Sequence, residues 1–241
     1  MIEYVLLLGG IRVREKFVAT SCYQKWNNAF QCVSISGDRG KKVNYEGKFY
    51  RDLAPKKAFW KVWENNIGKI SEEENNKFYI REYYRQVLSK LDPYMVYSDL
   101  DGKAMLCYEN ADEFCHRHIV AAWLELLLDV EVPEVEVKTI TTKIENEEVT
   151  YLSMDRVDRP SYIKEYLEVL LKEEMEMHRF KSVRAAYLYK QSELLEDKAS
   201  LVEVMGHSGD GYRQEACYLR CEADMAEDEY KERLRLLKLE K

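Results

Sequence analysis

The chain has 241 residues, of which 46% are hydrophobic and 12% aromatic, so it can bury a core and an intrinsically disordered protein is excluded. It carries 37 basic and 44 acidic residues, and its 10 glycines and 4 prolines are too few for a collagen-like or low-complexity protein. The sequence contains no run of 18 apolar residues and does not open with a signal-peptide pattern. We therefore expect a cytoplasmic protein with no contact to a membrane.

Charge is distributed unevenly along the chain. Residues 1–129 carry a net charge of +1, whereas residues 130–241 carry −8. This shift predicts an α/β domain over 1–130, followed by a hairpin and a helical region over 131–241. Between Arg39 and Lys61, eight basic residues stand against two acidic ones. Such a segment is either a solvated loop or an attractor of phosphate groups.

In the first region, short β-prone segments alternate with amphipathic helical patterns. Strands are predicted at Phe17–Tyr23, Gln31–Ser36 and Ala104–Glu109, with Ile2–Leu8 as a further candidate. Helices are predicted at Lys56–Asn66, from Ser71 to a stop at Pro93, and at Cys115–Leu128. The polar segment 37–53 is predicted to be a loop. This alternation indicates an α/β architecture, in which sites usually lie at the carboxyl ends of the strands.

After residue 130 the pattern changes. Two alternating segments, Val135–Ile144 and Glu148–Met154, predict a β-hairpin. Three helices are predicted to follow at about residues 162–178, 182–205 and 212–238, the last two separated by the glycine-containing segment 206–211.

Residues 104–124 read AMLCYENADEFCHRHIVAAWL and place a short loop between a strand and a helix start. This pattern resembles the domain-of-unknown-function family numbered 488, in which a strand ends Leu-Cys-x-Glu and Cys-His-Arg opens a helix. Leu106–Glu109 and Cys115–His118 carry the resemblance, and the segments 19–23, 34–36 and 52–55 extend it over about residues 17–128. After residue 36 the family pattern has an arginine with a downstream proline, whereas this chain has Gly37-Asp38-Arg39-Gly40. The resemblance implies a three-layer α/β domain with a small, mostly parallel sheet, and it brings no established activity.

The residue types of this motif point to chemistry at a helix start. Cys115 faces the positive end of the helix dipole, which favours the thiolate, and Arg117 adds a second positive charge. His116 can carry a proton, and Glu109 can orient an imidazole or act as the base. We therefore predict an enzyme that acts on a phosphate-bearing substrate, such as a nucleotide or a nucleic-acid derivative. Its expected catalytic residues are Cys115, His116 and Glu109, and its expected substrate-binding residues are Arg117, Arg39 and His118.

Other interpretations of the motif stay open. Cys115 can be a small buried hydrophobe, with Arg117 pairing to Glu109 or Glu113 and locking the loop to the helix. The protein would then be a non-catalytic ligand-binding or adaptor protein, in which the acidic helical region mediates assembly. Cys107, Cys115, His116 and His118 are metal-ligand types, but their spacing matches no common zinc arrangement, so no metal and no cofactor is predicted. A small anionic or nucleotide-like ligand is the expected partner. Nucleic acid is less favoured, because no helix carries clustered basic residues, and the oligomeric state is left open.

Overall fold

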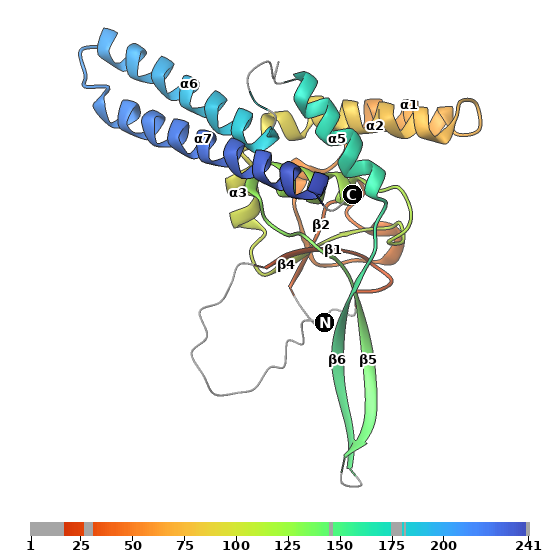
Figure 1. Ribbon diagram of the computed structural model, residues 1–241. Coiled ribbons are helices and arrows are strands. Elements are labelled where there is room, and N and C mark those ends of the chain that lie inside the picture. Colours follow the sequence, from red (N-terminus) through yellow and green to blue (C-terminus); the bar gives the residue numbers. More distant parts are fainter. Residues whose placement is uncertain (1–16, 27–30, 145–146, 175–179, 181, 240–241) are drawn as a thin grey trace. The chain divides into compact units, whose positions relative to one another are not determined.

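A computed structural model describes residues 17–26, 31–144, 147–174, 180 and 182–239 (Figure 1). The chain forms two compact units. The first contains the described residues up to Glu125 together with Val130–Leu167, and the second contains Leu126–Asp129 and the described residues from Glu168 onward. None of the helices formed by the described residues is long and apolar enough to cross a membrane. The predicted strand at Ile2–Leu8 lies outside the described residues.

The first unit is built on a six-stranded sheet with the order β3-β2-β4-β1-β5-β6. Its strands are β1 (Val18–Cys22), β2 (Cys32–Ser34), β3 (Lys48–Phe49), β4 (Lys103–Cys107), β5 (Glu134–Ile144) and β6 (Glu147–Val157). All neighbouring pairs are parallel except β5 and β6. The central strand β1 is buried along its whole length, as is typical of a parallel strand covered on both faces. The sheet and its helices confirm the predicted α/β class with a C-terminal helical region.

The predicted hairpin belongs to this sheet. Thr20 in β1 pairs in parallel with Glu134, the first residue of β5, and Ser21 Oγ donates a hydrogen bond to the Val135 carbonyl at 2.6 Å. The hairpin therefore lies in the first unit, although the charge shift at residue 130 grouped it with the helical region. Beyond this start, β5 and β6 pair with each other and extend past the other strands (Figure 1).

The prediction of a loop over residues 37–53 was wrong in part. This segment contains the edge strand β3 and two short 3₁₀ helices, Lys41–Val43 and Arg51–Leu53. A two-residue strand is too short to leave an alternating pattern in the sequence. Two hydrogen-bonded ladder positions, Val33 with Lys48 and Ser34 with Phe49, hold it against β2.

Among the described residues, four α-helices precede the hairpin: α1 (Lys57–Asn66), α2 (Glu72–Gln86), α3 (Pro93–Asp99) and α4 (His116–Leu128). The predicted stop at Pro93 was wrong, because α2 ends at Gln86 and Pro93 is the first residue of α3. Proline suits that position, since its missing N–H would have no helical partner and its φ angle is already helical. The side chain of Asp92 caps α3 by accepting hydrogen bonds from the N–H groups of Tyr94 and Met95.

The second unit contains an antiparallel pair of long helices, α6 (Val183–Val204) and α7 (Asp210–Leu239), which lie side by side (Figure 1). Ala199, Ala216 and Ala223 are fully buried, and small side chains of this kind let two helices approach closely. The backbone N–H of Ser182 donates to Glu227 at 2.8 Å, which ties the start of α6 to α7. α5 (Ser161–Glu174) precedes this pair, and its residues from Glu168 onward belong to the second unit.

Ser71 caps α2 as the sequence predicts. Its Oγ accepts from the Glu74 N–H at 3.2 Å and donates to Glu74 Oε2 at 2.7 Å. We expect Ser71→Ala to lower the free energy of unfolding of the first unit by about 1 kcal/mol, because a helix N–H loses its partner. Urea unfolding followed by tryptophan fluorescence measures this, since all four tryptophans lie in the first unit. The exposed Ser89→Ala is the matched control, and an equal loss in both variants would contradict the cap.

Candidate functional site

The candidate site lies at the carboxyl edge of the parallel sheet, where β2 and β4 end and α4 begins. Cys107 is the last residue of β4, and Ile35 directly follows β2. Cys115 immediately precedes the first residue of α4, which is His116. Eight residues from the strand end to the helix start thus suffice to bring Cys107 and Cys115 together at the edge where such folds usually place their sites.

Cys107, Cys115 and His116 form a buried group that we call the Cys–His cluster. His116 Nδ1 lies 3.8 Å from Cys107 Sγ and 3.8 Å from Cys115 Sγ. On the other side of the ring, His116 Nε2 lies 3.0 Å from the Ile35 carbonyl oxygen. A proton on Nε2 donates to that carbonyl, so Nδ1 is the nitrogen that exchanges a proton with the sulfur atoms.

Glu109 connects the Cys–His cluster to the surface. Its Oε2 lies 2.9 Å from Cys115 Sγ, with one hydrogen bond between the two groups. Glu109 also lines the pocket described below, whereas Cys115 is only 2% exposed. The carboxyl group is therefore the member of the predicted catalytic set that a ligand meets first.

The electrostatics of the cluster favour a charged Cys115. Burial raises the pKa of the Cys107 thiol far above its usual range, so this group stays protonated. Burial also works to raise the pKa of Cys115, but the hydrogen bond with Cys107 and the charges of Arg117 and His116 outweigh it and hold this pKa well below its usual range. Burial works to lower the pKa of His116, and the negative charges of Cys115 and Glu109 raise it overall. The result is a thiolate beside an imidazolium.

Glu109 changes its protonation near neutral pH. Burial raises its pKa to about 7, and the neighbouring charge of Cys115 acts in the same direction. A carboxyl group with this pKa can both donate and accept a proton at pH 7, which a surface glutamate does not do.

The side chains of Arg117 and His118 contact Glu134 and not the Cys–His cluster. Arg117 is fully buried and pairs with Glu134 at the start of β5, with Nε and Nη2 3.0–3.2 Å from the carboxylate oxygens. Its Nη2 also donates to the Asn110 carbonyl at 2.9 Å, and His118 Nε2 lies 3.2 Å from Glu134 Oε2. We call Arg117, His118 and Glu134 the arginine lock. Nε and Nη2 of the guanidinium are engaged with protein groups, Nη1 has no hydrogen-bond partner among the described residues, and the whole side chain is shielded from solvent.

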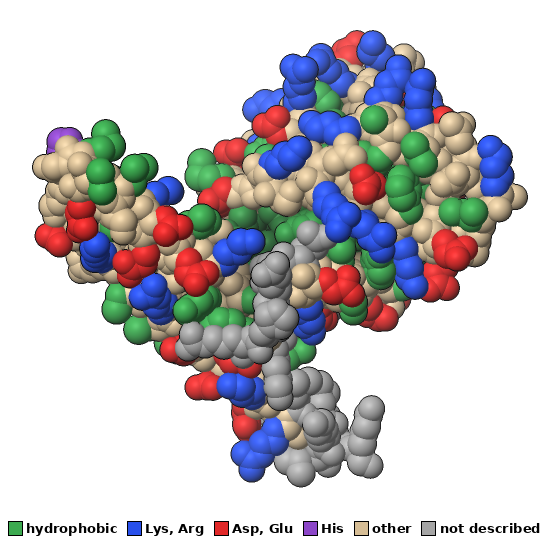
Figure 2. Space-filling view, turned by 90° about the horizontal axis from the view of Figure 1, so that it is seen from above, with side chains coloured by type: hydrophobic (Ala, Val, Ile, Leu, Met, Phe, Trp, Pro, Cys, Tyr) green, Lys and Arg blue, Asp and Glu red, His purple; other side chains and the backbone are tan. Residues whose placement is uncertain are grey.

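Arg39 lies on the surface, with its guanidinium over the ring of Phe49. Its guanidinium carbon is 5.0 Å from the centre of the Phe49 ring, and the residue is exposed. The seven other basic residues between Arg39 and Lys61 are exposed as well, and two of them, Lys57 and Lys61, belong to α1 and not to a loop. Figure 2 shows one face of the molecule, on which Lys and Arg side chains gather along one side with Asp and Glu among them.

A second polar network supports the loop that follows β2. Tyr23 Oη lies 2.6 Å from Ser34 Oγ and 2.9 Å from Ser36 Oγ, and Tyr108 Oη donates to Asp38 at 2.8 Å. Gly40 has a φ of +74°, and a Cβ there would lie 2.6 Å from Cβ of Tyr45, so the turn requires glycine. This network explains the Ser36–Gly40 segment without an anion-binding role.

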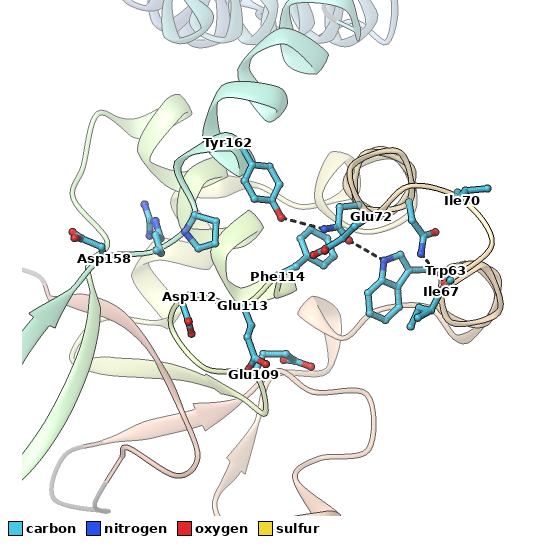
Figure 3. A pocket seen from close by; sticks show the side chains of 15 residues that line it. Trp63, Ile67, Ile70, Glu72, Glu109, Asp112, Glu113, Phe114, Asp158 and Tyr162 are labelled. Atoms are coloured by element: carbon cyan, nitrogen blue, oxygen red, sulfur yellow. Dashed lines mark hydrogen bonds between the residues drawn. The ribbon is translucent and has the colours of Figure 1, made fainter.

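A pocket of about 710 Å³ opens beside Glu109 (Figure 3). Its walls come from α1, the start of α2, the loop before α4 and the segment that leads into α5. The aromatic rings of Trp63, Phe114 and Tyr162 line it, and Glu109 and Glu113 lie close together at one end of it. The volume is within the range of small-molecule sites.

The donor atoms of the Cys–His cluster are also of the types that zinc takes. The sulfur atoms of Cys107 and Cys115 and a ring nitrogen of His116 all lie within 4.8 Å of one another. Structural zinc sites have four protein donors, whereas this group supplies three among the described residues. His118, which the sequence analysis counted among the ligand types, belongs to the arginine lock instead.

Sequence reasoning missed three parts of this site. Glu134 is separated from Arg117 by the rest of α4 and the segment that follows it, and nothing in its local sequence marks it as the partner. The Ile35 carbonyl is a backbone group, which leaves no sequence signal. The pocket was not predicted at all, and only the fold shows that Trp63 and Tyr162 line a cavity with Phe114.

No protein-family model, no curated protein and no solved structure matches this chain. The resemblance carried by Leu106–Glu109 and Cys115–His118 therefore stays a prediction.

We expect Arg117→Leu to lower the free energy of unfolding of the first unit by about 3–5 kcal/mol, because it leaves the buried carboxylate of Glu134 without its main partner. Adding Glu134→Gln should recover part of this loss, since the uncompensated charge disappears. Urea unfolding with tryptophan fluorescence again measures the effect. The control Arg156→Ala removes an exposed ion pair with Glu131 and should cost no more than about 1 kcal/mol. Equal effects of the two single substitutions would contradict the lock.

Proposed function

We propose that the protein is a cysteine-dependent enzyme in which Cys115, His116 and Glu109 act on a substrate held in the pocket. One observation carries this proposal: Glu109 lines the pocket and is hydrogen bonded to Cys115, which lies beside the His116 imidazole. A single carboxyl group thus links a cavity of substrate size to a thiolate and a proton carrier. Such a set of nucleophile, base and proton donor supports covalent catalysis.

Each group has a distinct role in this proposal. The Cys115 thiolate attacks an electrophilic carbon of the substrate, so that an S–C bond forms and the bond to the leaving group breaks. Glu109, which moves aside to expose the sulfur, donates its proton to the leaving group. Water then gives a proton to Glu109 and attacks the same carbon, which releases the product and restores the thiolate. The imidazolium of His116 stabilises the thiolate before and after the reaction.

The phosphate-bearing substrate expected from the sequence needs basic side chains that are free to bind a phosphate group. Arg117 and His118 are engaged with Glu134, and Arg39 lies over Phe49. The pocket is lined by five acidic residues, and its one arginine among the described residues, Arg159, is paired with Glu125. These surroundings disfavour the binding of an anion, so we do not propose a phosphate-bearing substrate for this pocket.

The alternative of a non-catalytic protein rests on the arginine lock. Arg117 joins the helix start to β5 and to the loop after β4, but its carboxylate partner is Glu134 and not Glu109 or Glu113, the two partners expected from the sequence. This favours a structural role for the second half of the motif. Cys115 and His116 take no part in these hydrogen bonds, so the lock does not account for them.

Turnover of 4-nitrophenyl acetate distinguishes the two functions. We expect the protein to release 4-nitrophenolate and to carry an acetyl group on Cys115, detected by mass spectrometry. His116→Asn should lower the rate about 100-fold, because the thiolate loses its counter-charge and the reaction loses its proton carrier. In the wild type the rate should change with pH around 7, because the pKa of Glu109 is raised to about 7. In Glu109→Gln this pH dependence should disappear.

The matched control is Cys22→Ser, which removes another buried thiol at the end of the neighbouring strand. Its rate should equal that of the wild type. An equal rate in wild type and Cys115→Ser, with no acetyl group on Cys115, would favour the structural role over the enzyme.

A further inference from the structure

We infer that the pocket beside Glu109 binds an organic cation, in which an amine, guanidine or quaternary ammonium group is carried on a small apolar body. This names the substrate class of the site proposed above and rests on that proposal for its chemistry. The binding itself is carried by the walls of the pocket and can be measured separately.

The charge of the lining is the first observation. Five carboxyl groups line the pocket, those of Glu72, Glu109, Asp112, Glu113 and Asp158. Arg159 is the one basic side chain among the described lining residues, and its Nη2 lies 2.7 Å from Glu125 while Nη1 donates to the Val132 carbonyl. The pocket is therefore left with a surplus of negative charge, carried mainly by four exposed carboxylates, which attracts cations and repels anions.

The aromatic walls are the second observation, and they are independent of the charge. The ring centres of Trp63 and Phe114 lie 5.9 Å apart, and Tyr162 lies across the pocket from Glu109 (Figure 3). The negative face of an aromatic ring attracts an organic cation, and its apolar area contacts the rest of the ligand. A hydrated metal ion gains little from such walls, so the pair of features selects an organic cation.

The walls are also held in place before a ligand arrives. Trp63 Nε1 donates to Asn76 Oδ1 at 3.1 Å, and Asn76 Nδ2 donates to Tyr162 Oη at 3.1 Å. Asn75 Nδ2 donates to the Trp63 carbonyl at 2.9 Å. Both asparagines are buried in α2, so these bonds fix the ring of Trp63 in α1 and the ring of Tyr162 in α5 relative to each other. A preformed pocket loses less free energy in ordering its walls when it binds a ligand.

Isothermal titration calorimetry with three probes of similar size tests the inference on the full chain: benzyltrimethylammonium, benzyl alcohol and phenyl phosphate. We expect the cation to bind at least about 10-fold more tightly than either of the others, from its attraction to the carboxylates and rings. Trp63→Leu should weaken cation binding by about 5-fold or more. The double substitution Glu72→Gln/Asp112→Asn should weaken it about 10-fold, because two exposed charges of the lining are lost without a change in shape.

The matched control is Glu131→Gln, which removes an exposed carboxylate outside the pocket and should leave the affinity unchanged. Tighter binding of phenyl phosphate, equal binding of all three probes, or no binding of the cation would overturn the inference. If the cation binds while the ester test shows no dependence on Cys115, the proposed reaction fails and the cation site stands. The converse result removes the cation site and keeps the enzyme.

Discussion

The buried ion pair between Arg117 and Glu134 is the interaction on which the arrangement of the site depends. Taking both charges out of water is costly, and the cost is offset only because two guanidinium nitrogens contact the carboxylate while the Asn110 carbonyl accepts a further hydrogen bond. These contacts join the start of α4, the loop after β4 and the start of β5. The first turn of α4 is thereby fixed on the sheet edge, and Cys115 and His116 are fixed with it.

This constraint divides four consecutive residues into two pairs. Cys115 and His116 contact Cys107 and the Ile35 carbonyl, whereas Arg117 and His118 contact Glu134. Neighbouring residues on a helix point about 100° apart, so a helix start can serve two contacts at once. Arg117 nevertheless acts on the first pair, since its charge helps to hold the pKa of Cys115 low. Lock and thiolate are thus coupled through electrostatics and not through a shared hydrogen bond.

The sequence carries the local part of this account and leaves out the distant part. The strands other than β3, the Ser71 cap and the start of α4 were predictable, because each is encoded by periodicity or capping within a few residues. β3 and α3 were missed, since a two-residue strand has no period and Pro93 can end one helix or begin another. The Arg117–Glu134 pair, and a pocket built from Trp63, Phe114 and Tyr162, depend on chain packing that no local pattern encodes.

The rate at which iodoacetamide alkylates each cysteine as a function of pH tests the central claim most directly, read by mass spectrometry with and without a chelator. We predict that Cys115 reacts at pH 6 while the protonated Cys107 does not, since the thiolate is the nucleophile, and that the chelator changes nothing. The exposed Cys217 and Cys221 are internal controls, because their alkylation shows that the reagent is active at each pH. Reaction of Cys115 only after chelation would make the cluster a metal site. Inertness until the protein unfolds would make Cys115 part of the core and contradict the account.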